Sequence, residues 1–170
     1  MPSLGIEKMR RKDRAITALH DIEAIIRNSL VCRLGLSDSE KAYIVPMCFG
    51  YHNRTFYLHS AQKGLKLDII RRNNQVCVEC ECGTEVVRGK NFCDWGMKYR
   101  SVIGFGKAVL LDDINEKKAA LRIIMQQYTE ADSFEFSEIS LDRTCVIRVD
   151  IDQITGKMAG YDKNSSESDL

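Results

Sequence analysis

Residues 43–70 read YIVPMCFGYHNRTFYLHSAQKGLKLDII, and this stretch decides the fold of the chain. Two apolar runs flank a polar break at residues 51–54 (YHNR), which is typical of a hairpin turn between two strands. After the second run, Leu65, Ile69 and Ile70 follow a helical spacing. The stretch therefore predicts a β-hairpin that is followed directly by a helix.

The junction between the second strand and this helix is a candidate phosphate site. The strand ends at His59 and Ser60, Gly64 opens the helix, and Lys66 lies in its first turn. A helix N-terminus offers unpaired N–H donors and a partial positive charge, which suit a phosphate group. His59 lies where binding residues tend to be found, although a purely structural histidine is the alternative.

The composition is that of an ordinary globular chain. Of the 170 residues, 44% are hydrophobic and 29% are charged, and the net charge is +1. This length favours one domain with a real core, and the balanced charge argues against a general nucleic-acid or membrane surface. No run of about 18 apolar residues is present, so no membrane span is predicted. The charged N-terminus lacks an apolar signal core, so we expect a cytoplasmic protein.

The remaining chain consists of further strand and helix patterns. Periodicity predicts helices over residues 17–28 and 113–129, and strands over residues 30–36, 76–82, 99–111 and 144–151. Residues 83–91 and 129–142 are expected to be connections. Gly104 and Gly106 inside one strand predict a bend, a bulge or a close approach. Because most strands follow one another directly, an antiparallel barrel or meander is favoured over a doubly wound parallel sheet.

The seven cysteines are expected to be free thiols. Their number is odd and no secretion signal accompanies them, which fits a reducing compartment better than a disulfide framework. Cys77 and Cys80 have C-x-x-C spacing, but on a strand they point to opposite faces, so no metal site is predicted. A Cys/His hydrolase has little support, because no nucleophile motif accompanies the histidines.

Residues 94–102 (DWGMKYRSV) hold the only tryptophan. Trp95 could cover a flat aromatic ligand while Arg100 neutralises an anion beside Ser101. A surface loop that packs its tryptophan on the barrel is the alternative, and the sequence does not decide between the two.

Four segments taken together resemble a known family. They are MRRKDR, VPMCFGY, YLHSAQKGLKLDII and CDWGMKYRSVIGFGKA, in this order. They are similar to the nitroimidazole-resistance branch of the pyridoxamine 5'-phosphate oxidase-like proteins, over approximately residues 9–157. The resemblance implies a mainly β (α+β) fold, a six-stranded antiparallel split β-barrel with flanking helices. It also implies one flavin-binding domain over residues 1–160. The Ser- and Asp-rich composition of the C-terminus predicts a disordered tail over residues 161–170.

The same resemblance implies a homodimer with a flavin at the interface. FMN is the expected cofactor and FAD is possible, while haem bound by His59 or His20 is a third option. The implied catalytic residue is His59, and Trp95 would come from the neighbouring subunit. The implied cofactor-binding residues are Val45, Pro46, Met47, His59, Ser60, Lys66, Trp95, Arg100, Ser101 and Val102.

The implied activity is that of a flavin-dependent oxidoreductase. It would take electrons from a small-molecule donor and reduce a small electrophile such as a nitroaromatic compound, with the redox chemistry supplied by the flavin. A flavin-binding carrier or sensor without turnover is the alternative from another functional class.

Overall fold

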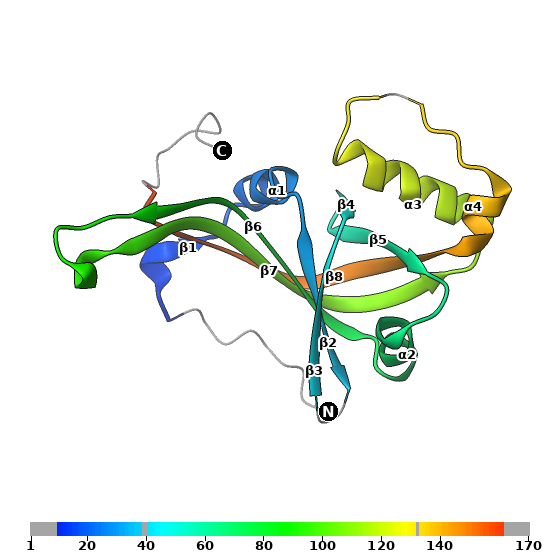
Figure 1. The fold of residues 1–170 in the computed structure, drawn as a ribbon, viewed down its shortest axis with the longest axis horizontal. Coiled ribbons are helices and arrows are strands. Elements are labelled where there is room, and N and C mark those ends of the chain that lie inside the picture. Colours follow the sequence, from blue (N-terminus) through cyan, green and yellow to red (C-terminus); the bar gives the residue numbers. More distant parts are fainter. Residues whose placement is uncertain (1–9, 39–40, 132, 162–170) are drawn as a thin grey trace.

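The computed structural model describes residues 10–38, 41–131 and 133–161, and it is built around one antiparallel sheet (Figure 1). Its strand order is β3-β2-β6-β7-β8-β5-β4, with the short β1 paired to β8. The strands are β1 (Ala15–Ile16), β2 (Cys32–Asp38), β3 (Lys41–Met47), β4 (Phe49–His52), β5 (Thr55–Ala61), β6 (Gln75–Val87), β7 (Gly96–Leu111) and β8 (Thr144–Ala159). The predicted mainly β architecture with flanking helices is confirmed.

Four α-helices flank this sheet in the described part of the chain. They are α1 (Leu19–Arg27), α2 (Leu65–Arg72), α3 (Ile114–Gln126) and α4 (Glu138–Arg143). Two 3-10 turns, η1 (Lys12–Arg14) and η2 (Phe92–Asp94), complete the elements. None of the helices in the described ranges is both long and apolar enough to cross a membrane.

The two outermost strands of the sheet are joined by the chain itself. β3 and β4 end the strand order on opposite sides, yet only Cys48 separates them in sequence. Pro46 lies in β3, an edge strand, which is where a strand tolerates a missing N–H donor. The Tyr128 hydroxyl accepts from the Phe49 N–H at 2.8 Å and donates to the Leu30 carbonyl at 3.0 Å. Tyr128, two residues after the end of α3, therefore holds the junction between β3 and β4 in place.

The predicted hairpin turn is confirmed between β4 and β5. His52 pairs with Thr55, and the two residues between them, Asn53 and Arg54, have φ angles of 48° and 62°. Positive φ at both central positions is the requirement of a type I′ turn, which matches the twist of the flanking strands.

The core has two apolar clusters on opposite faces of the sheet. The larger cluster is enclosed by the barrel and includes Phe49 and Phe56, with Ile26 from α1 and Leu67 from α2 packed into it. The smaller cluster lies under α3 and consists of Leu111, Ala120 and Val146. The helices thus cover both faces at the end of the sheet where β8 begins.

Three predicted boundaries are wrong, and long-range pairing explains two of them. Residues 83–91 are not all loop, because β6 resumes its pairing with β7 after a bulge at Gly83 and runs to Val87. The last strand continues beyond residue 151 to Ala159, because β7 pairs with it along its whole length. The connection over residues 129–142 contains α4, whose first turn is capped by the Ser137 side chain.

The expected six strands become eight for two local reasons. The strand that leads into the hairpin divides at Cys48 into β3 and β4. The two-residue β1 adds a short pairing in which Ala15 and Ile16 lie opposite Lys157 and Gly156. Neither change alters the class of fold.

Candidate functional site

The structure places the predicted site residues at two ends of the sheet. His59 pairs with Val146 near the start of β8, whereas Arg100 pairs with Met158 near its end. The stretch of β8 from Val146 to Met158 spans about 40 Å. Within one chain, the two groups of residues therefore do not form a single site.

The first end carries His59 and Ser60 at the close of β5. The His59 side chain is exposed, and Ser60 lies directly opposite Cys145 of β8. The Ser60 hydroxyl donates to the carbonyl of the next residue at 2.9 Å. It is thus a small hydroxyl at the edge of the sheet, immediately before the segment that leads into α2.

That segment is held against the start of β8 by Gln62. Its side-chain amide donates to the carbonyls of Asp142 at 2.8 Å and Thr144 at 3.1 Å. These two bonds fix the direction in which the chain enters α2, so they position the first turn of that helix beside Ser60.

The N-terminus of α2 has no side-chain cap among the described residues. Gly64 precedes the helix with a φ of 141°, and its carbonyl accepts from the N–H groups of Leu67 and Asp68. The first turn of α3 differs, because the Asp113 carboxylate accepts from two N–H groups there at 2.9 Å. The first turn of α2 therefore offers backbone donors to an anion.

Three cationic side chains gather around this end of the sheet. Lys66 is in the first turn of α2, Arg71 is in its last turn, and Lys117 is in the first half of α3. Burial raises the pKa of the Cys145 thiol, while the charges of Lys117, Arg71 and Lys66 lower it and that of Asp112 raises it. All three cations thus lower the pKa of the Cys145 thiol, and Cys145 is the strand partner of Ser60. Reasoning from the sequence missed Lys117, because helical periodicity assigns it to the polar side of α3.

At the second end, Arg100 is covered by its own chain. It is only 5% exposed, and its guanidinium carbon lies 3.7 Å from the centroid of the Tyr161 ring. The Tyr161 hydroxyl donates to the carbonyl of Gly83, which has a φ of 61° in the bulge of β6. A ligand would reach the Arg100 guanidinium from this side only if Tyr161 moved.

Tyr161 is the first residue of the predicted tail, yet it packs against the sheet. The rest of that predicted tail, residues 162–170, lies outside the described residues. The segment MRRKDR (residues 9–14) is described only from Arg10 onward, where Arg11 forms an ion pair with Asp13 at 2.6 Å. That the chain forms a single domain is still a prediction.

The neighbours of Arg100 alternate between the two faces of β7. Val102 is buried in the barrel core, so its side chain is not available to a ligand. Ser101 points to the outer face, where its strand partners are Glu81 and Lys157. Of these three predicted residues, only Ser101 presents its side chain on an open surface.

Trp95 lies in the arm that β6 and β7 form beyond their bulge (Figure 1). Its ring is partly exposed. The guanidinium carbon of Arg88 lies 5.7 Å from the centroid of this ring, and the centroid of the Phe92 ring lies 5.9 Å from it. The tryptophan therefore belongs to a projecting hairpin and does not pack on the barrel of its own chain.

The predicted segment Val45-Pro46-Met47 forms the end of the edge strand β3. Met47 is buried in the core, whereas Pro46 is exposed on the outer face. The side of β3 away from β2 pairs with no strand among the described residues. The backbone of this segment is consequently accessible along one edge.

The outer face of the sheet carries several exposed apolar side chains. Ile103, Phe105 and Val109 alternate along β7 on the same side as Ser101, and Ile44 of β3 lies in the row of Phe105. Ile44 is 65% exposed, and the three residues of β7 are between 37% and 40% exposed. An uncovered apolar face of this kind marks an interaction surface more often than an ordinary solvated one.

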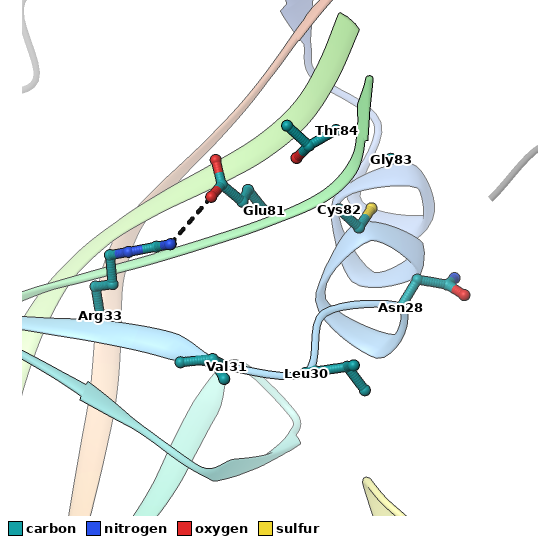
Figure 2. A pocket seen from close by; sticks show the side chains of 8 residues that line it. All are labelled: Asn28, Leu30, Val31, Arg33, Glu81, Cys82, Gly83 and Thr84. Atoms are coloured by element: carbon teal, nitrogen blue, oxygen red, sulfur yellow. Dashed lines mark hydrogen bonds and ion pairs between the residues drawn. The ribbon is translucent and has the colours of Figure 1, made fainter. Parts of the chain in front are cut away.

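A separate hollow lies beside the C-terminal end of α1 (Figure 2). Its volume is about 320 Å³. Arg33 lies at one side of it (Figure 2) and donates to Glu81 at 3.1 Å and to Glu79 at 2.9 Å. Its lining consists of Asn28, Leu30, Val31, Arg33, Glu81, Cys82, Gly83 and Thr84. None of the predicted cofactor-binding residues lines it, so the hollow and the predicted site are different places.

The cysteines are all free, and three of them lie in the core. Cys32 and Cys80 face each other across β2 and β6, and burial raises the pKa of the Cys80 thiol to about 12. No group of three or more metal-ligating side chains gathers within the described ranges.

Comparison with known proteins identifies the family. The model of the pyridoxamine 5'-phosphate oxidase family matches residues 19–158. The chain is similar to a proposed 5-nitroimidazole antibiotic resistance protein from Bacteroides thetaiotaomicron, at 39% identity and a TM-score of 0.76, over 85% of this chain and 86% of that one. A comparison with curated proteins found no match.

Two more distant structures share the fold. An FAD-binding protein from Mesorhizobium loti is 24% identical with a TM-score of 0.64, over 86% of this chain and 98% of that one. A flavocytochrome from Azotobacter vinelandii is 17% identical with a TM-score of 0.79, over 95% of this chain and 77% of that one. The resemblance seen in the sequence is confirmed, and the chain belongs to the pyridoxamine 5'-phosphate oxidase family of split-barrel proteins.

Proposed function

We propose that this protein is a flavin-binding oxidoreductase that acts as a homodimer and reduces a small electrophile such as a nitroaromatic compound. The observation that carries the proposal is the uncapped first turn of α2 beside Ser60 and Lys66, in a chain whose structural relatives include FAD-binding proteins. These donors fit a flavin phosphate. FMN needs only one such site, and FAD would use the same one.

A second copy of the chain would complete the site, because the two ends lie too far apart within one copy. Ser101 and Leu111 mark those ends on β7, since Leu111 and His59 share the partner Val146. Phe105 lies midway between them on the same face. A two-fold axis near Phe105 would therefore set the Ser101 end of one chain against the His59 end of the other.

The outer face supplies a suitable contact for this arrangement. The exposed side chains of Ile103, Phe105 and Val109 surround the midpoint, so their burial would drive association. The arm with Trp95 would extend beyond the first chain and could cover the flavin of the second. The dimer thus gives each of the predicted groups a role that a single chain does not.

The roles within such a site follow from the placement of the residues. Ser60 and Lys66 would bind the phosphate, and the open edge at residues 45–47 would offer backbone groups to the ring. A bound flavin would supply the redox chemistry, taking electrons from a nicotinamide or similar donor and passing them to the acceptor. His59, which is exposed beside Ser60, would orient the acceptor or donate a proton to it.

The first test is the visible spectrum of the purified protein, followed by chromatography of the released chromophore. We expect a yellow protein that releases FMN or FAD and reduces a nitroaromatic acceptor with NAD(P)H. Replacing His59 by glutamine should lower turnover, and full turnover together with full flavin affinity would contradict a role for His59 in the site. A colourless protein that refuses added flavin would contradict the proposal. A yellow protein without turnover would indicate a carrier or sensor, and a haem band would redirect attention to the histidines.

The dimer is tested by replacing Phe105 with aspartate. A carboxylate at the centre of an apolar contact lacks a partner, so dimerisation should weaken at least about a hundredfold. Analytical ultracentrifugation with simultaneous flavin absorbance should show a monomer that has lost its flavin. The control is Ile139→Asp, because Ile139 is 66% exposed on α4 and belongs to none of the strands that carry the exposed apolar side chains. A Phe105→Asp protein that stays dimeric would overturn this arrangement.

A further inference from the structure

We infer that Tyr161 is a positioning residue, which fixes the direction in which the arm with Trp95 leaves the sheet. This arm consists of residues 84–98, beyond the bulge of β6. Its attachment to Tyr161 stands on contacts between described residues alone. The consequence for flavin binding rests on the proposed function, in which the arm covers the flavin of the second chain.

The arm is a two-stranded ribbon without a third strand beside it. β2 pairs with β6 only as far as Cys80, and β8 pairs with β7 only from Tyr99 onward. Among the described residues, the stretches that begin at Glu85 and end at Lys98 therefore pair only with each other, and Figure 1 shows them extending beyond the sheet. Such a ribbon is marginally stable by itself, and a bulge bends and twists its base. The direction of the arm consequently depends on contacts at this base.

Tyr161 contacts both strands at the base of the arm. It lies two residues after the end of β8, and its hydroxyl donates to the carbonyl of Gly83 in the bulge of β6. On the other strand, the guanidinium carbon of Arg100 lies 3.7 Å from the centroid of its ring, and the Lys98 ammonium nitrogen lies 5.7 Å from it. A cation over an aromatic face is attracted by the ring. Tyr161 thus ties the end of β8 to both strands from which the arm extends.

Two glycines bring the tyrosine this close to the arm. Gly83 has a φ of 61°, and an added Cβ would lie 2.8 Å from the Tyr161 hydroxyl oxygen. Gly160 has a φ of 74°, and a Cβ there would lie 2.6 Å from Cγ of Lys98. Both backbone conformations favour glycine, and a larger side chain at either position would displace the ring or the arm. The local backbone is therefore shaped around this contact.

Lys98 carries the contact from Tyr161 into the arm. It is the strand partner of Glu85 and forms an ion pair with it at 3.2 Å. Its ammonium group is thus held by the ring of Tyr161 and by a carboxylate on the opposite strand. Because Trp95 precedes Lys98 by only three residues, a change at the base of the arm moves the tryptophan as well.

A held arm lowers the cost of covering a ligand, because only molecules whose arm points in the right direction are ready to bind. Trp95 would lie against the flavin ring, whereas Ser60 and Lys66 would hold the phosphate. Loss of Tyr161 should therefore weaken the binding of FMN and of riboflavin, which lacks the phosphate, by the same factor. A defect at the phosphate would affect FMN alone.

The first test uses Trp95 as a reporter, because it is the only tryptophan in the chain. Time-resolved fluorescence anisotropy of the flavin-free full chain measures how freely it moves. Tyr161→Phe removes the hydrogen bond, and Tyr161→Ala removes the ring as well. The control is Tyr99→Phe, because the Tyr99 hydroxyl forms no hydrogen bond with a described residue.

We expect Tyr161→Ala to add a fast nanosecond component to the anisotropy decay, because the arm then moves independently of the sheet. Tyr161→Phe should add a smaller one, since its ring still lies over Arg100. Tyr99→Phe should leave the decay as in wild type. A decay in Tyr161→Ala that equals the wild-type decay would overturn the inference.

The second test is titration of the same proteins with FMN and with riboflavin. The dissociation constants of both ligands should rise about fivefold in Tyr161→Phe and about thirtyfold in Tyr161→Ala, and remain unchanged in Tyr99→Phe. A loss for FMN alone, or unchanged affinities in a protein with a mobile arm, would overturn the role of Tyr161 in flavin binding. A wild type that bound no flavin would refute the proposed function, and the anisotropy measurement would still decide whether Tyr161 holds the arm.

Discussion

Replacing Gly106 with alanine should lower the free energy of unfolding by about 3 kcal/mol. An added Cβ would lie 2.0 Å from the carbonyl oxygen of Asp150 and 2.9 Å from its carbonyl carbon. Both are backbone atoms, so no side-chain rotation relieves the contact. The position coincides with the register shift between β7 and β8, where the two strands approach closely. The alanine would therefore force apart the longest ladder of the sheet.

The control for this substitution is Gly96→Ala in the same strand. A Cβ at Gly96 meets no atom within 4 Å. Alanine there should leave stability unchanged or raise it by about 0.4–1 kcal/mol, because it restricts the unfolded chain. Urea denaturation of both variants measures the difference. Equal stability losses in the two variants would show that the close approach at Gly106 is not the cause.

Truncating Phe56 to alanine should cost about 3–5 kcal/mol of stability, because it removes a buried ring and leaves a cavity. Phe56 is 1% exposed, and its ring lies 5.5 Å from that of Phe49 and 5.0 Å from that of Tyr51. It is also part of β5, which carries His59 and Ser60 near its C-terminal end. Loss of this anchor should therefore weaken flavin binding as well as the fold.

The matched control is Phe92→Ala, because the Phe92 side chain is 89% exposed. That substitution should change stability by less than about 0.5 kcal/mol. Denaturant unfolding gives the stability difference, and a flavin titration at low denaturant gives the effect on the site. A Phe56→Ala protein as stable as Phe92→Ala would mean that the aromatic cluster does not hold the barrel together.

Much of the fold is predictable because the signals that set it are local. The hairpin turn follows from Asn53 and Arg54, which adopt positive φ between two apolar runs. The close approach at Gly106 follows from a glycine inside a strand. In contrast, the resumption of β6 beyond Gly83 depends on its pairing with β7, and the exposed residues of that arm carry no buried face to reveal it.

The place of single candidate residues in the chain is predictable from the sequence, but their arrangement in space is not. Ser60 and Lys66 are near each other in sequence, so their proximity follows from a strand that leads into a helix. The separation of His59 from Arg100 is set by the register of β8, which no local pattern contains. Tyr161 was missed for the same reason, since its contacts with Arg100 and Gly83 join segments that are distant in the chain.

The single residue that joins β3 to β4 places two locally paired hairpins next to each other in the chain. The β2–β3 and β4–β5 hairpins meet at Cys48 and need only neighbouring residues to form. β5 reaches its other partner only in β8, where Ser60 lies opposite Cys145. Such distant pairings form slowly because a long loop must close first. We therefore expect the two hairpins to form early in folding and the pairing of β5 with β8, which closes the barrel, to form late.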